Sequence, residues 1–574
     1  MKTKLAPKFL FIGIILIAAF FRLYDVNWDQ GYHLHPDERF LTMVGNAMRL
    51  PLSFSQYLDP QTSLFNPANI GFKFYVYGTF PLILNKLFAI VFSTDTYNDF
   101  TLQGRLLSGV SDLLIVFLIY KTLLLFEHEY KLNPKIKYWG AFFYAISVLP
   151  IQLSHFFTVD TFLNLFLFAS FYTILRFSLQ GKFSDLFLSA VFFGFASATK
   201  LNAVYVLPLL LFLLVRFVKK RHITNEMSKK SILKYLHNKS IRIRVAYACL
   251  LTVFYCALIY LTIRIADPYL FQSKNIFDPR PSILFLDNLK MLNYWNSPAV
   301  WYPPGVQWIH KTPILFSLQN LVFFGIGVPY FLFVFIGMVI TLRHWKRSIL
   351  LVILIWTGIF FLYQSAQYVQ TMRYFLIIYP FLAIFAAFGF HTLTKKWNPS
   401  YKALIVLLIL FWPLLFFSIY TKKHSRVEAS MWIYQNIPDG SMLLTEHWDD
   451  PLPLLLPQYA GRQYAEQQLP VFDQDAPEKW QKMNTLLANA DYYILSSNRA
   501  WGSMPTVPEK YPLMNIFYKE LFGGKRGFTK VKEFTSYPSL TYLGIPFELN
   551  DDWAEEAFTV YDHPKVLIFK INNK

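Results

Sequence analysis

Long apolar runs recur over residues 1–420 of this chain, and they constrain its fold more than any other feature. A helix needs about 20 mostly apolar residues to cross the hydrocarbon core of a bilayer, and the chain of 574 residues is 55% hydrophobic. We therefore expect an all-α polytopic membrane domain. Length and hydropathy predict about eleven transmembrane helices, at residues 8–24, 105–126, 138–153, 161–179, 185–199, 201–217, 245–264, 318–342, 348–363, 374–391 and 402–420.

Positive charge is concentrated in the short segments between these runs. A net charge of +19 would suggest a nucleic-acid partner in a soluble chain, but here Lys and Arg flank apolar segments, as the positive-inside rule requires. We therefore expect no nucleic-acid partner. Lys2, Lys4 and Lys8 precede the first run and place the N-terminus in the cytoplasm, on the same side as the basic loop 219–244. The prediction is a multi-pass protein of the cell (inner) membrane, in contact with membrane lipids.

One apolar stretch, residues 74–92, is interrupted by a proline and two polar residues. The segment that follows it, 93–104, carries two acidic residues and no Lys or Arg, which indicates an external position. The charges on both sides of the next span, 105–126, fit one topology only if residues 74–92 lie in the membrane interface and do not cross the membrane. This interpretation predicts two long external loops, at residues 25–104 and 265–316.

The composition changes after residue 420. Polar residues and prolines return, and short strand-like runs alternate with helical patterns. Residues 421–574 are therefore predicted to form a small extracytoplasmic α/β domain. Its expected strands are 442–445, 492–496 and 566–571, and its expected helices are 428–435 and 478–488.

A cluster of ionisable residues follows the first apolar run, where residues 32–40 read YHLHPDERF. Pro36 suits the first position of a helix, because its φ is fixed and it has no amide proton to leave unpaired. The spacing predicts an amphipathic helix from Pro36 to about residue 49, lying on the membrane surface. Asp37 and Glu38 fall in its first turn. Carboxylates there complement the helix dipole, so a purely structural role remains an alternative.

More ionisable residues are predicted at the same external face. Taken singly, Arg105 suits an interface anchor, Asp160 a helix N-cap and Lys200 a snorkelling side chain. An ionisable group as deep in apolar sequence as Arg373 is costly unless it is paired, which favours a functional role. The convergence of these residues with Asp37 indicates a site.

Such a site suits sugar transfer from a lipid carrier. Nucleotide-activated donors are not normally available outside the cell, so a transferase there needs a sugar carried by a polyprenyl phosphate. The cations would hold the phosphate leaving group, and Asp37 would deprotonate the acceptor hydroxyl. Direct in-line displacement would invert the anomeric centre.

Other interpretations remain open. A polytopic transporter or lipid flippase with an external domain would carry its ionisable residues near the bilayer midplane. A sensor would confine ligand binding to residues 421–574. No cofactor is required, but a divalent metal is an alternative, since His33, His35 and Asp37 share one side of an extended segment.

The order of these elements resembles the GT-C superfamily of polyprenyl-phosphate-dependent glycosyltransferases. Within it, the chain is similar to bacterial proteins of the protein O-mannosyltransferase and lipid A aminoarabinose transferase group, which is glycosyltransferase family 39-like. The resemblance spans roughly residues 1–420. It is carried by the Asp-Glu pair in the first external loop, the pair His155 and Asp160, the glycine–lysine segment 194–200, and the sequence RYFLIIYP at 373–380.

The resemblance implies particular residue roles. Asp37 would be the catalytic base and Glu38 would help to position the acceptor. Arg105, His155, Asp160, Lys200, Arg373 and Tyr374 would bind the substrate, with Lys200 and Arg373 near the lipid phosphate. The enzyme would be a hexosyl- or pentosyltransferase acting on a lipid, glycan or protein acceptor. A protein acceptor is not implied, because no β-trefoil insertion like that of the eukaryotic protein mannosyltransferases is visible.

Overall fold

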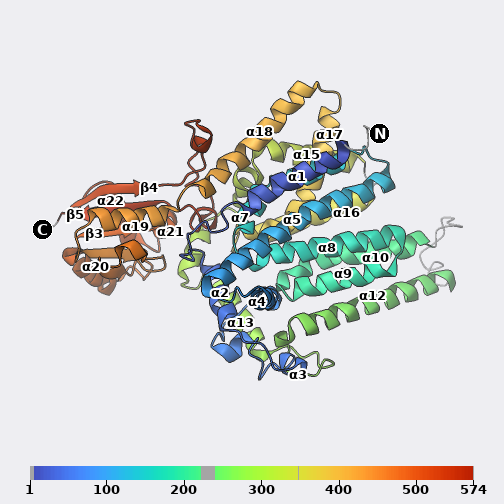
Figure 1. Ribbon diagram of the computed structural model, residues 1–574, viewed down its shortest axis with the longest axis horizontal. Helices are drawn as coiled ribbons and strands as arrows, with labels where there is room; N and C mark the ends of the chain where they lie inside the picture. The colour runs from blue at the N-terminus through green and yellow to red at the C-terminus, as the bar shows by residue number, and fades with distance from the viewer. Residues whose placement is uncertain (1–5, 222–238, 345, 347, 573–574) are drawn as a thin grey trace.

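The computed structural model describes residues 6–221, 239–344, 346 and 348–572. It shows a long bundle of helices with an α/β domain at one end (Figure 1). The predicted basic loop 219–244 falls mostly outside the described residues. The helices α2 (Pro36–Ala47), α4 (Phe80–Phe92) and α13 (Ile283–Trp295) lie at the end of the bundle that faces this domain.

Within the described residues, seven helical segments are long and apolar enough to cross a membrane, or eight if one bent pair counts as a span. The predicted number of eleven is not confirmed. The seven are α5 (Tyr97–Tyr130), α8 (Val159–Gln180), η2 with α10 (Leu201–Val206, Leu207–Arg221), α12 (Lys239–Ala266), α16 (Ser348–Ser365), η6 with α17 (Met372–Ile378, Tyr379–Thr394) and α18 (Pro399–Phe417).

The other predicted spans are helical too, but shorter or broken. They correspond to α1 (Ala6–Leu23), α6 with α7 (Ile136–Ala145, Val148–Ser154), α9 (Phe183–Ser197), and the bent pair formed by α14 with η5 (Leu315–Asn320, Leu321–Ile326) and α15 (Val328–Arg343). The bent pair turns through 114°. In the stretch 74–92, only α4 (Phe80–Phe92) is helical. Its 13 residues are too few for a span, as the interfacial interpretation requires.

The sharp bend in the predicted span 318–342 has a local cause. Gly327 has φ +85°, a backbone conformation that side chains with a Cβ rarely adopt. The preceding turn, η5, is a π-helix, which already breaks the regular ladder of hydrogen bonds. Figure 1 shows α15 packed beside α17 after the turn.

The first-loop helix α2 (Pro36–Ala47) forms where predicted, with Pro36 at its start. The nitrogen Nδ1 of the N-cap residue His35 accepts the amide of Glu38 at 3.3 Å. The position on the membrane surface stays a prediction, but the division into a buried and a polar side is less clean than predicted, since Met43 is exposed. Leu41 and Val44 are buried, and so are Glu38 and Thr42 on the side expected to be polar.

The C-terminal domain is α/β, as predicted. Its five strands are ordered β2-β1-β3-β5-β4; β1 is parallel to β2 and β3, and β5 is antiparallel to β3 and β4. They are β1 (Met442–Glu446), β2 (Ala465–Leu469), β3 (Tyr492–Leu495), β4 (Phe528–Phe534) and β5 (Val566–Ile571), and the main helices are α19 (Ser425–Asn436), α20 (Pro477–Asn489) and α22 (Pro512–Phe522).

Candidate active site

Asp37 forms an ion pair with Arg373, which lies 336 residues further along the chain. Asp37 lies in the first turn of α2 and Arg373 in η6, so the pair joins the segment after α1 to an apolar helix long enough to cross a membrane. The two side chains are 29% and 25% exposed, which leaves both within reach of a ligand. The acid and the base that the sequence predicted to meet are therefore in contact.

Lys200, Asp160 and Tyr374 lie beside this pair. The Nζ atom of Lys200 lies 2.8 Å from a carboxylate oxygen of Asp160 and 4.8 Å from the centre of the Tyr374 ring. The guanidinium of Arg373 lies 5.8 Å from the centre of the same ring. Tyr374 thus stands between two cations and holds them by cation–π contact.

These residues line one small cavity that has a polar and an apolar wall. The polar wall consists of Asp160, Lys200, Arg373 and Tyr374. The apolar wall comes from three membrane helices and consists of Leu163, Phe360, Leu376 and Ile377. The cavity has a volume of about 10 Å³, the space of about one water molecule. Its division into a charged and an apolar surface, but not its size, resembles that of a phosphate with a hydrocarbon tail.

A close backbone contact fixes the position of Lys200. The amide of Gly78 donates to the carbonyl of Thr199 at 2.9 Å, so the first external loop lies against the turn before Lys200. A Cβ at Gly78 would lie 2.0 Å from the carbonyl oxygen of Ala198. Only glycine permits this approach.

The charge of Asp37 is set by its surroundings. Burial raises the pKa of Asp37, but the charge of Arg373, followed by those of His35 and Lys200, lowers it to about 2. Asp37 is therefore ionised at neutral pH. While Asp37 is paired with Arg373, it is a weak proton acceptor. A carboxylate that takes up a proton loses its attraction to the paired cation.

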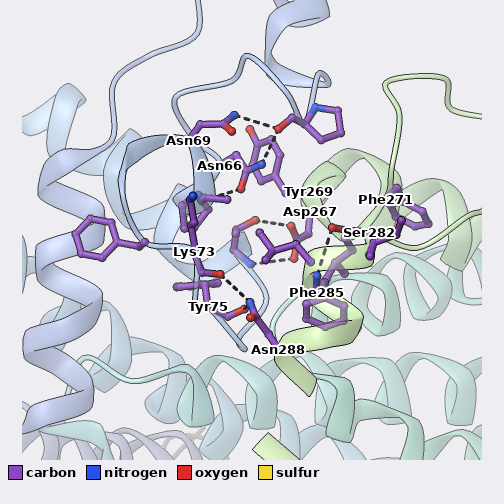
Figure 2. A pocket seen from close by; sticks show the side chains of 18 of the residues that line it. Asn66, Asn69, Lys73, Tyr75, Asp267, Tyr269, Phe271, Ser282, Phe285 and Asn288 are labelled. Carbon is purple, nitrogen blue, oxygen red and sulfur yellow. Dashed lines mark hydrogen bonds between the residues drawn. The ribbon is translucent and has the colours of Figure 1, made fainter. Parts of the chain in front are cut away.

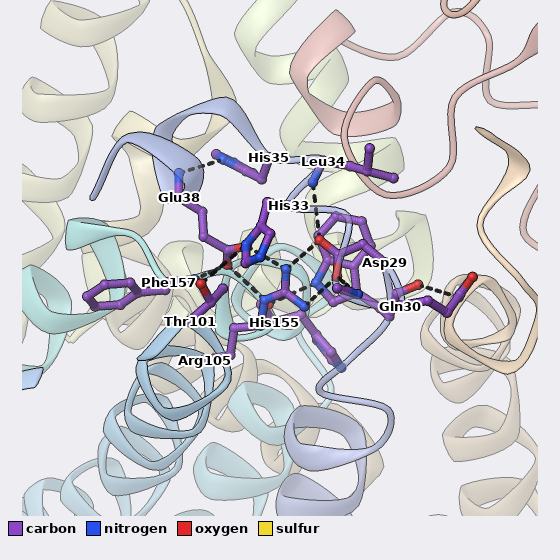
Figure 3. A network of polar contacts seen from close by, with 12 residues as sticks. Asp29, Gln30, His33, Leu34, His35, Glu38, Thr101, Arg105, His155 and Phe157 are labelled. Atoms are coloured by element: carbon purple, nitrogen blue, oxygen red, sulfur yellow. Dashed lines mark hydrogen bonds and ion pairs between the residues drawn. The ribbon is translucent and has the colours of Figure 1, made fainter. Parts of the chain in front are cut away.

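Glu38 and Arg105 belong to a separate, buried network (Figure 3). The Nε atom of Arg105 donates to Glu38 at 2.9 Å, and its two terminal nitrogens donate to Asp29 at 3.0 and 2.7 Å. Glu38 also accepts the amide of Phe157 at 2.7 Å. Arg105 is 1% exposed, and its partners are internal carboxylates. The structure therefore does not place these two residues in the cavity of Lys200, where the sequence predicted contact with substrate.

Asp29 was not singled out from the sequence. Burial alone would raise the pKa of Asp29, but the adjacent Arg105 lowers it to about 2, so the network contains one cation and two carboxylates. A lone Asp between Trp28 and Gln30 gives no signal of this role.

His155 also lies outside the cavity. It is 1% exposed and its ring stacks on Tyr420 with 3.8 Å between centroids. The nitrogens Nδ1 and Nε2 lie 2.8 and 3.0 Å from the carbonyl oxygens of Ile151 and Tyr24. Burial lowers the pKa of His155 to about 4, so the neutral ring donates to one of these carbonyls. Its position fits packing.

The histidines considered for a metal point to different partners. His33 contacts Asn98 at 2.7 Å and Thr101 at 3.2 Å, whereas His35 caps α2 and packs on Tyr561. In the part of the chain that the structure describes, no three His, Cys, Asp or Glu residues are grouped so that they could hold a metal ion.

The C-terminal domain adds residues that the sequence did not indicate. Tyr561 packs on His35 with 4.2 Å between ring centroids. Glu555 accepts the amide of Met372, the residue before Arg373, and its own amide donates to Asn320 at 2.8 Å. Burial raises the pKa of Glu555 to about 7. These contacts bring residues more than 500 positions into the chain next to the first external loop.

Tyr77 is another residue that the sequence did not indicate. Burial, and next the charge of Asp37, raise the pKa of Tyr77. Its position in an aromatic-rich segment, two residues after Tyr75, gives no sequence signal that separates it from its neighbours.

Comparison with known proteins agrees with this architecture. The Archaeoglobus fulgidus oligosaccharyltransferase in its apo form is similar over 100% of this chain and 89% of its own, with 11% identity and a TM-score of 0.50. ArnT from Cupriavidus metallidurans bound to undecaprenyl phosphate aligns with 88% of this chain and 95% of its own, at 13% identity and a TM-score of 0.42. The S. cerevisiae protein O-mannosyltransferase Pmt1-Pmt2 complex bound to the sugar donor aligns with 47% of this chain and 35% of its own, at 16% identity and a TM-score of 0.33. No curated protein sequence matches the chain.

The fold is that of a multi-pass membrane protein with a GT-C-like architecture. Residues 84–237 match the family model described as dolichyl-phosphate-mannose-protein mannosyltransferase. The resemblance to GT-C glycosyltransferases that the sequence indicated is thereby confirmed.

Proposed function

We propose that this protein transfers a sugar from a polyprenyl-phosphate donor to an acceptor hydroxyl at the outer face of the membrane. The main support is the cavity where Lys200 and Arg373 meet apolar side chains of membrane helices, next to the carboxylate of Asp37. The family match, whose description names dolichyl-phosphate-mannose, supports this class of donor. The sugar would be a hexose or a pentose, and the acceptor a lipid, glycan or protein.

The ion pair gives Asp37 a way to become a base when the donor binds. A donor phosphate competes for Arg373 and draws it from Asp37, which raises the pKa of that carboxyl. Asp37 then accepts the proton of the acceptor hydroxyl as its oxygen bonds to the anomeric carbon. The bond from that carbon to the phosphate oxygen breaks at the same time, and polyprenyl phosphate leaves, stabilised by Lys200 and Arg373. A single displacement inverts the anomeric centre.

The buried network has a supporting role in this scheme. Glu38 neighbours Asp37 on α2, and its bonds to Arg105 and to the amide of Phe157 fix the first turn of the helix. We assign Glu38 and Arg105 to positioning Asp37, and His155 to packing beneath it. Asp160 keeps Lys200 directed into the cavity.

The orientation follows from the charge pattern. The N-terminus lies in the cytoplasm of a cell (inner) membrane, and the site and the C-terminal domain lie outside. Single cysteines in the segment 93–104 and in the C-terminal domain should therefore react with a membrane-impermeant thiol reagent in whole cells, after the native Cys249 and Cys256 are replaced. Reaction at these positions only after the cells are opened would contradict the orientation.

Sugar transfer itself tests the proposed function. Purified protein in lipid nanodiscs is given a radiolabelled polyprenyl-phosphate sugar and an extract of cell-envelope glycolipids as the acceptor. We expect transfer by the native protein and a loss of at least about 100-fold with Asp37→Asn, which removes the base. Asp473→Asn is the matched control, since Asp473 is an exposed carboxylate of the C-terminal domain.

Two results would contradict the proposal. Full transfer by Asp37→Asn, at normal expression and elution volume, would remove Asp37 from the mechanism. Movement of labelled lipid or solute across proteoliposomes without any sugar transfer would instead favour the transporter or flippase.

A further inference from the structure

A second cavity lies between the two long external loops, apart from the one that Lys200 and Arg373 line (Figure 2). Its volume is about 450 Å³. The two loops are joined around it by hydrogen bonds. The amide and hydroxyl of Thr79 donate to the carboxylate of Asp267 at 2.9 and 2.6 Å, and the amide group of Asn288 donates to the carbonyl of Lys73 at 2.8 Å. The cavity is therefore a built feature of the folded loops.

This cavity adjoins the helix that carries Asp37. Phe72 and Tyr75 line the cavity and pack on Phe40 of α2, with ring centroids 5.9 and 6.0 Å apart. Tyr77 lines the cavity too, two residues after Tyr75. A ligand held here would have one end close to the proposed base.

The lining combines aromatic faces with planar amides. Rings are supplied by Phe72, Tyr75 and Tyr269, and amides by Gln61, Gln272 and Asn288. Aromatic faces pack against the C–H surface of sugar rings, and amides both donate to and accept from hydroxyls.

Other ligands suit this lining less well. A lipid tail would leave the amides without partners, which costs free energy for every buried polar group. The lining contains a single lysine, Lys73, and no arginine, whereas strong binding of a phosphate favours several charge-assisted bonds.

We propose that this cavity binds the saccharide portion of the acceptor and delivers its hydroxyl to Asp37. The inference rests on the proposed function, because it identifies the acceptor of that reaction as a sugar-bearing molecule. The donor and acceptor then approach Asp37 from two directions: the donor from the apolar cavity at Arg373, and the acceptor from between the external loops.

Saccharide binding can be measured without sugar transfer. Native protein in nanodiscs is mixed with soluble trisaccharides built from hexoses, N-acetylhexosamines or uronic acids, and saturation-transfer NMR reports which sugar protons contact the protein. Ala68→Trp places a large ring in the cavity, where Ala68 lies on the wall, without removing a side-chain hydrogen bond. The pair Gln61→Ala and Gln272→Ala removes two amides of the lining instead.

We expect at least one trisaccharide to bind the native protein, and about tenfold weaker binding in each cavity variant. Asn489→Ala, at an exposed asparagine of the C-terminal domain, should bind as the native protein does. Asp37→Asn should also keep its binding while it loses transfer, so failure of the cavity and failure of the catalytic proposal give different results.

The proposal is overturned if no trisaccharide in the panel binds, or if Ala68→Trp binds as well as the native protein does. Thermal unfolding and elution volume establish that each variant is folded. If one variant is misfolded, the other one decides the outcome.

Discussion

At the scale of single residues, two neighbouring carboxylates have different surroundings. Asp37 is 29% exposed and meets one arginine at the edge of a cavity. Glu38 is fully buried and shares Arg105 with Asp29. Helical spacing separates adjacent residues by about 100°, so the two side chains cannot share one environment.

This difference predicts separate effects of mutation. Glu38→Ala leaves Arg105 with one carboxylate and the amide of Phe157 without its acceptor, and breaking such a buried network costs about 3–5 kcal/mol. We expect a clearly lower unfolding temperature in detergent for Glu38→Ala. Asp37→Asn, at a partly exposed site, should unfold close to the native protein while losing transfer. Equal unfolding temperatures for Glu38→Ala and the native protein would contradict this assignment.

The sequence identified Asp37, Lys200 and Arg373 because ionisable groups in apolar surroundings are rare and need partners. It did not separate Arg105 from them, because the same argument applies to a structural arginine. What distinguishes Arg105 is its pairing with Asp29 and Glu38, which depends on how the loop folds back on α5. Such tertiary contacts leave no local pattern in one sequence.

At the scale of elements, the central strands were easier to predict than the edges. The strands β1, β3 and β5 have mostly buried side chains and match the predicted runs within two residues. The strands β2 and β4 form the two edges of the sheet. Four of the five residues of β2 are exposed, so its sequence, AEQQL, lacks the apolar residues that indicate a strand.

The strand β1 carries a pH-dependent contribution to stability. Glu446 is buried and accepts the hydroxyls of Tyr493 and Tyr518, each at 2.6 Å. Burial raises its pKa to about 7, above the usual value of about 4.3 in unfolded chains. The folded state therefore binds a proton that the unfolded state releases. The contribution of this proton to the free energy of unfolding is complete below about pH 4.3 and is lost as the pH rises through 7.

Between pH 5 and pH 8, we expect the unfolding temperature of the native protein to fall relative to that of Glu446→Gln. Glu446→Gln keeps an acceptor for both tyrosines but has no proton to lose, so its unfolding temperature should fall less over this range. Thermal unfolding at several pH values checks this. Parallel curves for the two proteins would show that Glu446 is ionised in the fold or does not contribute. Glu428→Gln, at an exposed glutamate of α19, is the control.

At the scale of the whole molecule, the C-terminal domain is part of the membrane domain's structure. Gln152 of α7 donates to Asp562 at 3.0 Å, and Tyr420 donates to the same carboxylate at 3.1 Å. Asp562 in turn lies against His563, whose other nitrogen is 2.9 Å from Asp551. Burial lowers the pKa of His563, but the two carboxylates raise it to about 10, so the buried cluster contains a cation.

A chain that ends at residue 421 should therefore accumulate poorly and show no transfer. Removal of the domain takes Tyr561 from His35 and Glu555 from the backbone before Arg373. Expression level and elution volume measure the first effect, and the labelled-donor assay measures the second. A truncated protein that remains active would show that the domain serves only acceptor selection or another separate task.

The length of α5 has a consequence for where the chemistry takes place. Its 34 residues rise about 1.5 Å each, giving a rod of about 51 Å, whereas the hydrocarbon layer is about 30 Å thick. Some four turns must stand clear of the lipid tails. Arg105, in the third turn, ties the base of the first loop to this rod. The contact of Arg105 with Glu38 and Asp29 holds α2, and with it Asp37, at a fixed level along α5. Under the proposed function, the sugar of a lipid carrier would have to reach only that level to react.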